Sequence, residues 1–102
     1  MIGIAIYGTQ RGWTDSRLQF TLLGVDAGKK ALRKLGNRIR DLRRERGWTQ
    51  EEFALEVSLA RSYIGGVERG ERNLSFINVA RIAGALDVSI SDLCEGVPPV
   101  AP

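Results

Sequence analysis

The sequence predicts an all-α domain of five short helices behind a non-helical N-terminal extension. Apolar residues recur at helical spacing from residue 29 to residue 95, and Ser, Thr and Gly punctuate that stretch where helices would begin and end. Residues 1–28 are rich in glycine and lack this periodicity. We therefore divide the 102-residue chain into an extension (1–28), a helical domain (29–95) and a disordered tail (96–102) that holds three prolines.

Within the extension, two segments have the composition of short strands. These are Ile2–Tyr7 and Leu18–Leu23, and the turn-forming stretch Gly8–Ser16 separates them as a loop. The sequence leaves open whether the two segments pair or stay disordered.

The first helix is expected to begin near Lys29 and to end before Gly47, a residue suited to a left-handed closing position. Its apolar stripe consists of Leu35, Ile39 and Leu42. The second helix opens at a capping box, in which the Thr49 hydroxyl accepts from the N–H of Glu52 and the Glu52 carboxylate reaches back. Its inward residues are Phe53, Ala54 and Val57, before Ser58–Ala60 interrupts it.

The third helix is expected from Arg61 to Glu68, with Gly70 after its end. Its inward residues are Ile64 and Val67. Ser75 caps a fourth helix, and a second capping box, Ser89–Asp92, opens a last short helix. The inward positions of these last two helices are Ile77 or Val79, Ile82, Ala83, Leu86 and Leu93.

The composition excludes several kinds of site. The chain has no histidine, and Cys94 is its only cysteine, so we expect no zinc site, no Cys–His or Ser–His nucleophile pair, no internal disulfide and no cofactor. Cys94 is interpreted as a small core residue. No segment has the ~18 apolar residues of a membrane span, so we expect a cytoplasmic protein without a membrane partner.

Positive charge is concentrated in one part of the chain. Ala27–Gly47 holds nine Lys or Arg against two acidic residues, whereas the chain from Trp48 onward holds four Arg against eight. A concentrated basic face is typical of a protein that binds phosphates, although a solvated helix has the same composition.

The second and third helices, joined by a turn of three or four residues, have the layout of a helix-turn-helix unit. The major groove is ~12 Å wide and admits one helix, whose N-terminal residues meet the base edges. The N-terminus of the preceding helix favours a backbone phosphate. The sequence therefore predicts binding to double-stranded DNA.

Three motifs in order give a specific resemblance: GWTQEEFA at 47–54, RSYIGGVERGERN at 61–73, and IAGALDV at 82–88. This pattern, spanning Leu32–Leu93, resembles the Cro/XRE family and, within it, the controller proteins of restriction–modification systems. The resemblance implies a lambda-repressor-like fold, a transcription regulator (repressor or controller) rather than an enzyme, and a homodimer that binds two half-sites.

The resemblance also implies roles for single residues. Gln50 would bind phosphate and buttress the recognition helix, and Arg61 and Ser62 would reach base edges. Arg43 and Glu68 would form an internal ion pair. The implied DNA-binding set is Thr49, Gln50, Arg61, Ser62, Tyr63, Gly66, Arg69, Arg72 and Asn73, and the implied dimer interface is Ile90, Leu93 and Val97.

Each role has a plainer alternative. Gln50 can be an ordinary first-turn residue, Arg61 a solvated arginine, and Tyr63 a residue at the edge of the core. Arg69 and Arg72 can simply pair with Glu68 and Glu71, their acidic neighbours in sequence.

The sequence departs from the family at two points. Ser58 stands in the turn where glycine is common, and serine tolerates a left-handed backbone less well. Gly65-Gly66 lies inside the recognition helix at a cost of about 1 kcal/mol per glycine. We expect these glycines to let the backbone approach the groove, leaving specificity to Arg61, Ser62 and DNA shape.

Two alternative functions have weaker support in the sequence. An antitoxin would use residues 1–26 to bind a protein toxin and would also bind DNA. An enzyme would need the stretch Gly24–Lys30 to act as a phosphate-binding loop. That stretch is one residue short between its glycines and lacks the Ser or Thr that would hold magnesium.

Overall fold

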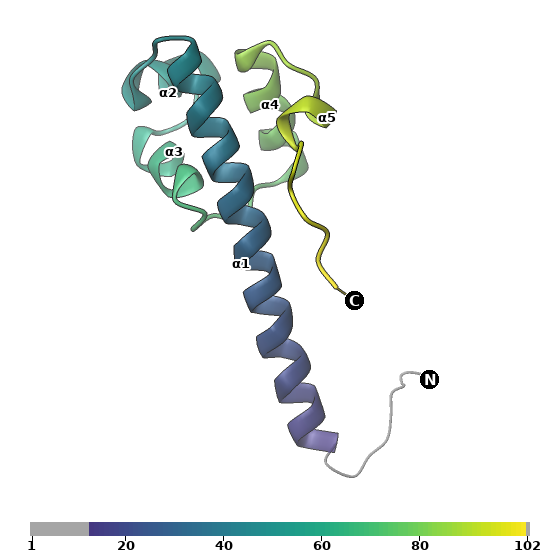
Figure 1. Cartoon of the computed structure of the whole chain (residues 1–102). Coiled ribbons are helices and arrows are strands. Elements are labelled where there is room, and N and C mark those ends of the chain that lie inside the picture. The colour runs from purple at the N-terminus through teal and green to yellow at the C-terminus, as the bar shows by residue number, and fades with distance from the viewer. Residues whose placement is uncertain (1–12, 102) are drawn as a thin grey trace.

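The computed structural model describes the backbone of residues 13–101 and the side chains of residues 28–101 (Figure 1). This part of the chain is helical and contains no strand, which confirms the predicted five-helix, all-α class. The helices are α1 (Trp13–Glu45), α2 (Gln50–Val57), α3 (Arg61–Glu68), α4 (Phe76–Leu86) and α5 (Ile90–Leu93). Among the described residues, no helix is both long enough and apolar enough to cross a membrane.

Helix α1 is much longer than predicted. It begins at Trp13 rather than near Lys29, so the strand expected at Leu18–Leu23 is wrong, and residues 13–16 of the expected loop are helical. The segment Ile2–Tyr7 lies outside the described residues. Adding a residue to an existing helix is cheaper than starting a new one, and no proline stands between Trp13 and Lys29 to stop the extension.

Figure 1 shows α1 as a long rod whose C-terminal half crosses the four short helices and whose N-terminal half extends away from them. The C-terminal half contacts α3, α4 and α5, while α2 packs against α3 and α4. A helix of 33 residues spans roughly 50 Å, which exceeds the width of the small domain that it crosses.

Each of the five helices contributes a fully buried side chain to one core. These residues are Ile39, Phe53, Ile64, Ile82 and Leu93, each with 0% of its surface exposed. The other predicted inward positions are also buried or packed against the core, with one choice settled: Val79 faces the core, whereas Ile77 is 61% exposed. Cys94 is half-buried against the same core, as expected.

The predicted helix ends are present. Gly47 has φ +75°, and Thr49 and Glu52 form both hydrogen bonds of the capping box. Ser75 caps α4 through a hydrogen bond from the N–H of Asn78. Ser89 accepts the N–H of Asp92, but in the described chain Asp92, one methylene shorter than Glu52, makes no return bond. The second capping box is therefore only half formed.

The turn between α2 and α3 uses a serine in a glycine-like conformation. Ser58 has φ 62° and ψ 43°, and its N–H bonds to the carbonyls of Ala54 and Leu55 at the end of α2. Ala60 then precedes α3 with an extended backbone. The left-handed conformation of Ser58 sets the sharp change of direction between α2 and α3.

Two glycines allow α1 to touch the end of α3 directly. A Cβ added to Gly36 would lie 2.4 Å from the carbonyl oxygen of Val67 and 2.6 Å from that of Glu68. A Cβ on Gly70, which has φ +76°, would lie 2.8 Å from the Cα of Arg33. The end of the recognition helix is thus fixed against the backbone of α1.

Candidate nucleic-acid interface

Helix α3 has one buried face and one free end. Ile64 and Val67 anchor it in the core, while Arg61 and Ser62, the first two residues of the helix, are exposed. A helix held in this way can present its N-terminal side chains to a groove without losing core contacts. The two predicted base-reading residues are therefore accessible at the start of α3, and their role at base edges stays a prediction.

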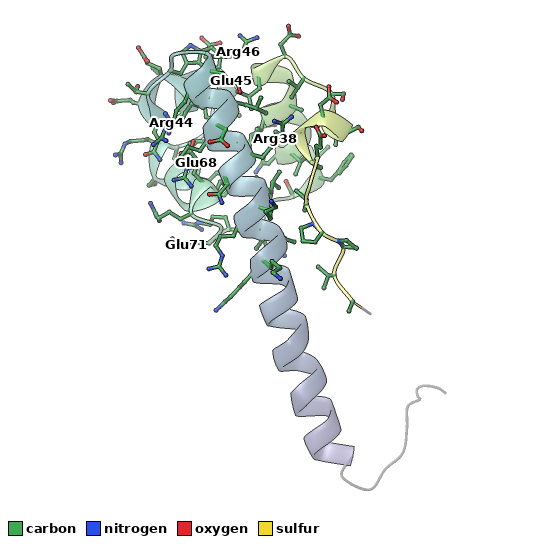
Figure 2. All side chains as sticks on the ribbon, viewed as in Figure 1. Arg38, Arg44, Glu45, Arg46, Glu68 and Glu71 are labelled. Atoms are coloured by element: carbon green, nitrogen blue, oxygen red, sulfur yellow. The ribbon has the colours of Figure 1, made fainter. Side chains whose placement is uncertain are left out.

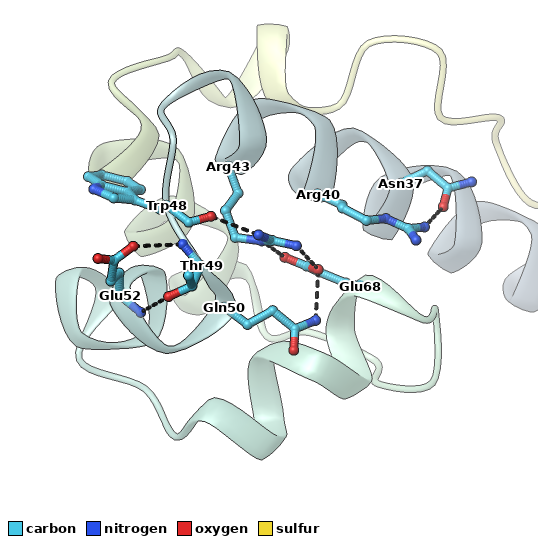
Figure 3. A network of polar contacts seen from close by, with 8 residues as sticks. All are labelled: Asn37, Arg40, Arg43, Trp48, Thr49, Gln50, Glu52 and Glu68. Carbon is cyan, nitrogen blue, oxygen red and sulfur yellow. Dashed lines mark hydrogen bonds and ion pairs between the residues drawn. The ribbon is translucent and has the colours of Figure 1, made fainter.

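A buried polar network holds the C-terminal end of α3 (Figure 3). The Nε of Arg43 donates to Oε2 of Glu68 at 2.7 Å, and its Nη2 donates to Oε1 at 3.0 Å. The remaining Arg43 nitrogen donates to the carbonyl of Trp48 at 2.8 Å, and Gln50 Nε2 donates to Glu68 Oε1 at 3.0 Å. The ion pair implied by the resemblance is therefore present, with contacts to α1, α2 and α3.

This network fixes geometry rather than supplying a reactive group. The side chains of Arg43 and Glu68 are 8% and 2% exposed, and bidentate geometry satisfies both carboxylate oxygens. No buried side-chain nitrogen or oxygen among the described residues lacks a hydrogen-bond partner. Because burying charges costs free energy even when they are paired, the network is better explained by the orientation it imposes on α3 than by stability.

Of the two roles predicted for Gln50, the structure shows the contact that supports α3. Its amide nitrogen binds Glu68, and its amide oxygen would lie 3.8 Å from a Cβ on Gly65, so its side chain lies alongside α3. Thr49, just before it, is exposed, and its hydroxyl accepts the N–H of Glu52. Phosphate binding at this helix start stays a prediction.

Tyr63 lies at the edge of the core, and its predicted contact to phosphate stays a prediction. Its ring is half-buried against the core, and its hydroxyl accepts a hydrogen bond from Asn78 Nδ2 at 3.1 Å. Since the hydroxyl is the acceptor in this bond, its own hydrogen is available to donate to a phosphate oxygen. The sequence did not predict this contact of Asn78, because it depends on the packing of α4 against α3.

The Gly65-Gly66 step is covered rather than open. Both glycines are buried: a Cβ on Gly65 would lie 3.1 Å from an Arg69 guanidinium nitrogen, and one on Gly66 would lie 3.1 Å from Arg72 Cγ. In the protein without DNA, arginine side chains therefore cover this step, and the expected approach of the backbone to the groove stays a prediction. The arginine side chains fold back because no β-carbon occupies the space beside the helix.

Arg69 and Arg72 also have partners of their own. Arg69 Nε lies 3.1 Å from Oε2 of Glu71, and the Arg72 guanidinium carbon lies 5.6 Å from the centre of the Tyr63 ring. The hydrogen bond from Arg69 lowers the pKa of the Glu71 carboxyl, and its partner carboxylate raises the pKa of Arg69. Asn73, which follows in the loop, is exposed.

The basic residues of α1 divide into two groups (Figure 2). Arg38 and Arg43 bind internal partners: Arg38 donates twice to the carbonyl oxygen of Asp92, at 3.1 and 2.9 Å, and so ties α1 to α5. Arg40 is half-buried and donates to Asn37, whereas the exposed group on α1 consists of Lys29, Lys30, Arg33, Lys34 and Arg44, with Arg46 exposed directly after the helix. Positive charge therefore remains on the surface, including at Arg33 beside the loop that follows α3.

The predicted dimer interface changes at one residue. Leu93 is fully buried within the single chain and is not free for a partner, whereas Ile90 and Val97 are only half-buried against the core and stay predicted contacts. The short α5 packs against α1 and α4, which encloses Leu93. Among the residues whose side chains are described, the large exposed apolar ones are Leu55, Phe76, Ile77 and Val100.

Comparison with known proteins decides the family. A helix-turn-helix family model matches residues 39–93, a span that covers more than half of the chain and includes α2, the turn and α3. The chain belongs to this helix-turn-helix family. The resemblance to Cro/XRE regulators is thereby confirmed, and the protein is a DNA-binding transcription regulator.

Related proteins of this family include named control proteins. The chain is 36% identical over 65 residues to control protein C.MunI of Mycoplasma sp, covering 63% of this chain and 88% of that protein. It is 39% identical over 61 residues to control protein C.BamHI of Bacillus amyloliquefaciens, covering 59% of this chain and 75% of that protein.

A solved structure gives the same relationship. The restriction-modification controller protein C.AhdI from Aeromonas hydrophila superposes with a TM-score of 0.59 at 48% identity, covering 61% of this chain and 94% of that one. These relatives give no support to the antitoxin alternative. They also give none to a nucleotide-binding enzyme.

Proposed function

We propose that this helix-turn-helix regulator reads operator DNA with α3 placed in the major groove. The observation that carries this proposal is the combination of a free, exposed helix start at Arg61 and Ser62 with a helix end fixed by Glu68. Arginine suits bidentate recognition of guanine, and serine can donate or accept at a base edge. Base reading requires that such side chains approach the groove at a fixed angle, which the Arg43–Glu68–Gln50 network supplies.

Contacts to phosphate would surround this helix. The first N–H groups of α2, at and after Gln50, have no carbonyl acceptor within their own helix. Such groups suit a phosphate oxygen. Tyr63, Arg69, Arg72 and Asn73 lie on α3 or in the loop after it, and Arg33 of α1 adjoins that loop. These contacts would set register and affinity, while Arg61 and Ser62 would set sequence preference.

The function that we propose in the cell is that of a controller or repressor acting on its own promoter. The support is the similarity to C.MunI, C.BamHI and C.AhdI, which are named as control or controller proteins. A methyltransferase or endonuclease gene beside the gene of this protein would support a restriction–modification system. Genes of other kinds at that position would favour a repressor of another system.

Binding as a homodimer is the second part of the proposal. One recognition helix reads only a few base pairs, and specific binding at physiological salt usually needs two half-sites about one helical turn apart. Phe76 and Ile77 in the first turn of α4 are 68% and 61% exposed, and such adjacent apolar side chains suit a partner surface. We therefore place the dimer contact at the start of α4.

Sedimentation of two matched variants tests the dimer contact. Ile77→Asp should shift the protein toward monomer at micromolar concentration, whereas Leu55→Asp, an equally drastic change at a 76% exposed apolar site, should leave the dimer intact. A wild-type monomer both with and without operator would contradict the dimer. Equal loss of dimer in both variants would contradict the α4 location.

Fluorescence anisotropy tests the function itself. The duplex would be the DNA just upstream of the gene, compared with a scrambled duplex at two salt concentrations. Tighter binding to the upstream duplex that persists at the higher salt concentration would establish a sequence-specific autoregulator. Equal, salt-sensitive binding to both duplexes would leave only a basic surface and would overturn the proposal.

A further inference from the structure

The DNA-facing loop after α3 carries an acidic residue that neither base reading nor phosphate binding explains. Glu71 lies between Arg69 and Arg72, is 59% exposed at its side chain, and pairs with Arg69 through a 3.1 Å contact. Figure 2 places Glu71 at the end of α3, away from the buried Glu68. A carboxylate in a surface that would meet a phosphate backbone opposes binding, so its presence needs a physical reason.

The local backbone makes this pair possible. Arg69 is the C-terminal capping residue of α3, and Gly70 follows it in a left-handed conformation with φ +76°. This reversal returns the chain so that Glu71, only two residues later, faces the Arg69 side chain. A β-carbon at Gly70 would lie 2.8 Å from Arg33 Cα, so the conformation of the turn is also held from the side of α1.

The same pair holds Arg69 against the helix. The guanidinium group lies over Gly65, where a β-carbon would come within 3.1 Å of one of its nitrogens. Arg72 lies over Gly66 and Tyr63 in a parallel arrangement, but without a comparable carboxylate contact. Of the two arginines that cover the glycine step, Arg69 is therefore the one whose donors are already engaged by an anion.

A DNA phosphate and the Glu71 carboxylate would use the same donors of Arg69. Both are anions that accept charge-assisted hydrogen bonds from a guanidinium fork. Glu71 is ionised at neutral pH, as an exposed glutamate ordinarily is, and the bond from Arg69 lowers the pKa of its carboxyl further. Because the pair is exposed to solvent and therefore weak, a phosphate can displace it at modest cost.

We propose that Glu71 is an intramolecular competitor of DNA phosphate for Arg69, and that this competition lowers the affinity of the regulator for non-operator DNA. The inference rests on the proposed DNA interface. In the operator complex, base contacts from Arg61 and Ser62 keep the helix seated long enough for Arg69 to exchange Glu71 for a phosphate. On other sequences those base contacts are missing, and Arg69 stays with Glu71.

Anisotropy with random duplex DNA and the full chain tests the competition. Glu71→Gln should raise the affinity for random DNA about two- to fivefold at low salt and steepen the salt dependence by about one ion. The matched control is Glu56→Gln, which changes the net charge equally at an exposed site on α2 beside α4. It should leave the affinity nearly unchanged.

The Arg69→Ala background separates competition from simple repulsion. If Glu71 acts through Arg69, Glu71→Gln should have no further effect in that background, and this result would support the inference. A gain that persists without Arg69 would mean direct repulsion of phosphate and would overturn it. Weaker binding by Glu71→Gln would mean that Glu71 positions Arg69 for DNA, which also overturns it.

Failure of the inference and failure of the proposed function give different results. Wild-type protein that binds operator tightly but shows no change on Glu71→Gln contradicts only the competition. Wild-type protein that binds no duplex contradicts the proposed function and the competition with it. Thermal unfolding of each variant should match wild type, since both side chains of the pair are exposed.

Discussion

Gly36 of α1 and Val67 of α3 are in direct backbone contact. A β-carbon at Gly36 would clash with the Val67 carbonyl oxygen, because it would lie closer than a Cβ atom approaches any unbonded heavy atom. The neighbour is backbone within a helix and cannot rotate away as a flexible side chain can. The distance between these two helices, and hence the position of the recognition helix, therefore depends on the absence of a side chain at residue 36.

Gly36→Ala should destabilise the domain by about 1–3 kcal/mol or more, as overpacking does elsewhere. Urea unfolding monitored by circular dichroism measures this loss. Gly84→Ala is the matched control: Gly84 is a helical glycine of α4 with no atom within 4 Å of its added Cβ, and the substitution should stabilise by about 0.5–1 kcal/mol. Equal effects at both sites would contradict the close contact.

Removing one member of the buried ion pair should cost about 3–5 kcal/mol, because the other charge stays buried. We expect this loss for Arg43→Met and for Glu68→Leu, measured by chemical denaturation. The double variant should lose clearly less than the two single losses added together, since neither charge is left unpaired. Strict additivity would contradict a direct interaction between the two residues.

Ser58→Gly should stabilise the protein by about 0.4–1 kcal/mol. Ser58 has φ 62°, a left-handed conformation that strains a residue with a β-carbon and does not strain glycine. The midpoint of urea unfolding reports the change. Ser62→Gly, inside α3, should move the midpoint the opposite way, because glycine lowers the stability of a regular helix.

Arg61→Ala should weaken operator binding by about 1–3 kcal/mol and relax discrimination at one base step. The measurement is anisotropy on the operator and on a set of duplexes altered at single positions. A loss of the same size on random DNA would contradict a base-reading role and would make Arg61 a phosphate contact.

Arg72→Ala should weaken operator and random DNA to a similar extent, and the salt slope should fall by about one. The reason is that Arg72 lies over Tyr63, in the loop that follows α3. In the proposed complex this loop faces the DNA backbone, a position suited to phosphate rather than to a base edge. A salt slope equal to that of wild type would remove Arg72 from the phosphate contacts.

The sequence predicted the parts of the fold that depend on local pattern. The helices after residue 47, the cap at Thr49 and the end at Gly47 follow from spacing and capping residues, and each is present. The start of α1 could not be predicted in the same way. The strand-like composition of Leu18–Leu23 is a weak local preference, and propagation from an adjoining helix overrides it.

For the candidate site, sequence patterns predicted the positions of individual residues better than the side chains that pack around them. They placed Arg61 and Ser62 at the head of α3 and paired Arg43 with Glu68. The patterns did not predict features that depend on three-dimensional packing. Leu93 is enclosed by its own chain, and Asn78 of α4 donates to Tyr63 of α3. Arginine side chains cover Gly65 and Gly66. Contacts between residues far apart in the chain leave no periodic trace in one sequence.

The separation between a buried frame and an exposed helix start has an evolutionary consequence. Arg43, Glu68 and Gly36 cannot change without disturbing the position of α3, whereas Arg61 and Ser62 contribute little to the core. If Arg61 and Ser62 read bases as proposed, mutations at these two exposed positions change the preferred DNA sequence at almost no cost in folding. Lineages of such a regulator could acquire new operators by drifting at two residues while their scaffold stays constant.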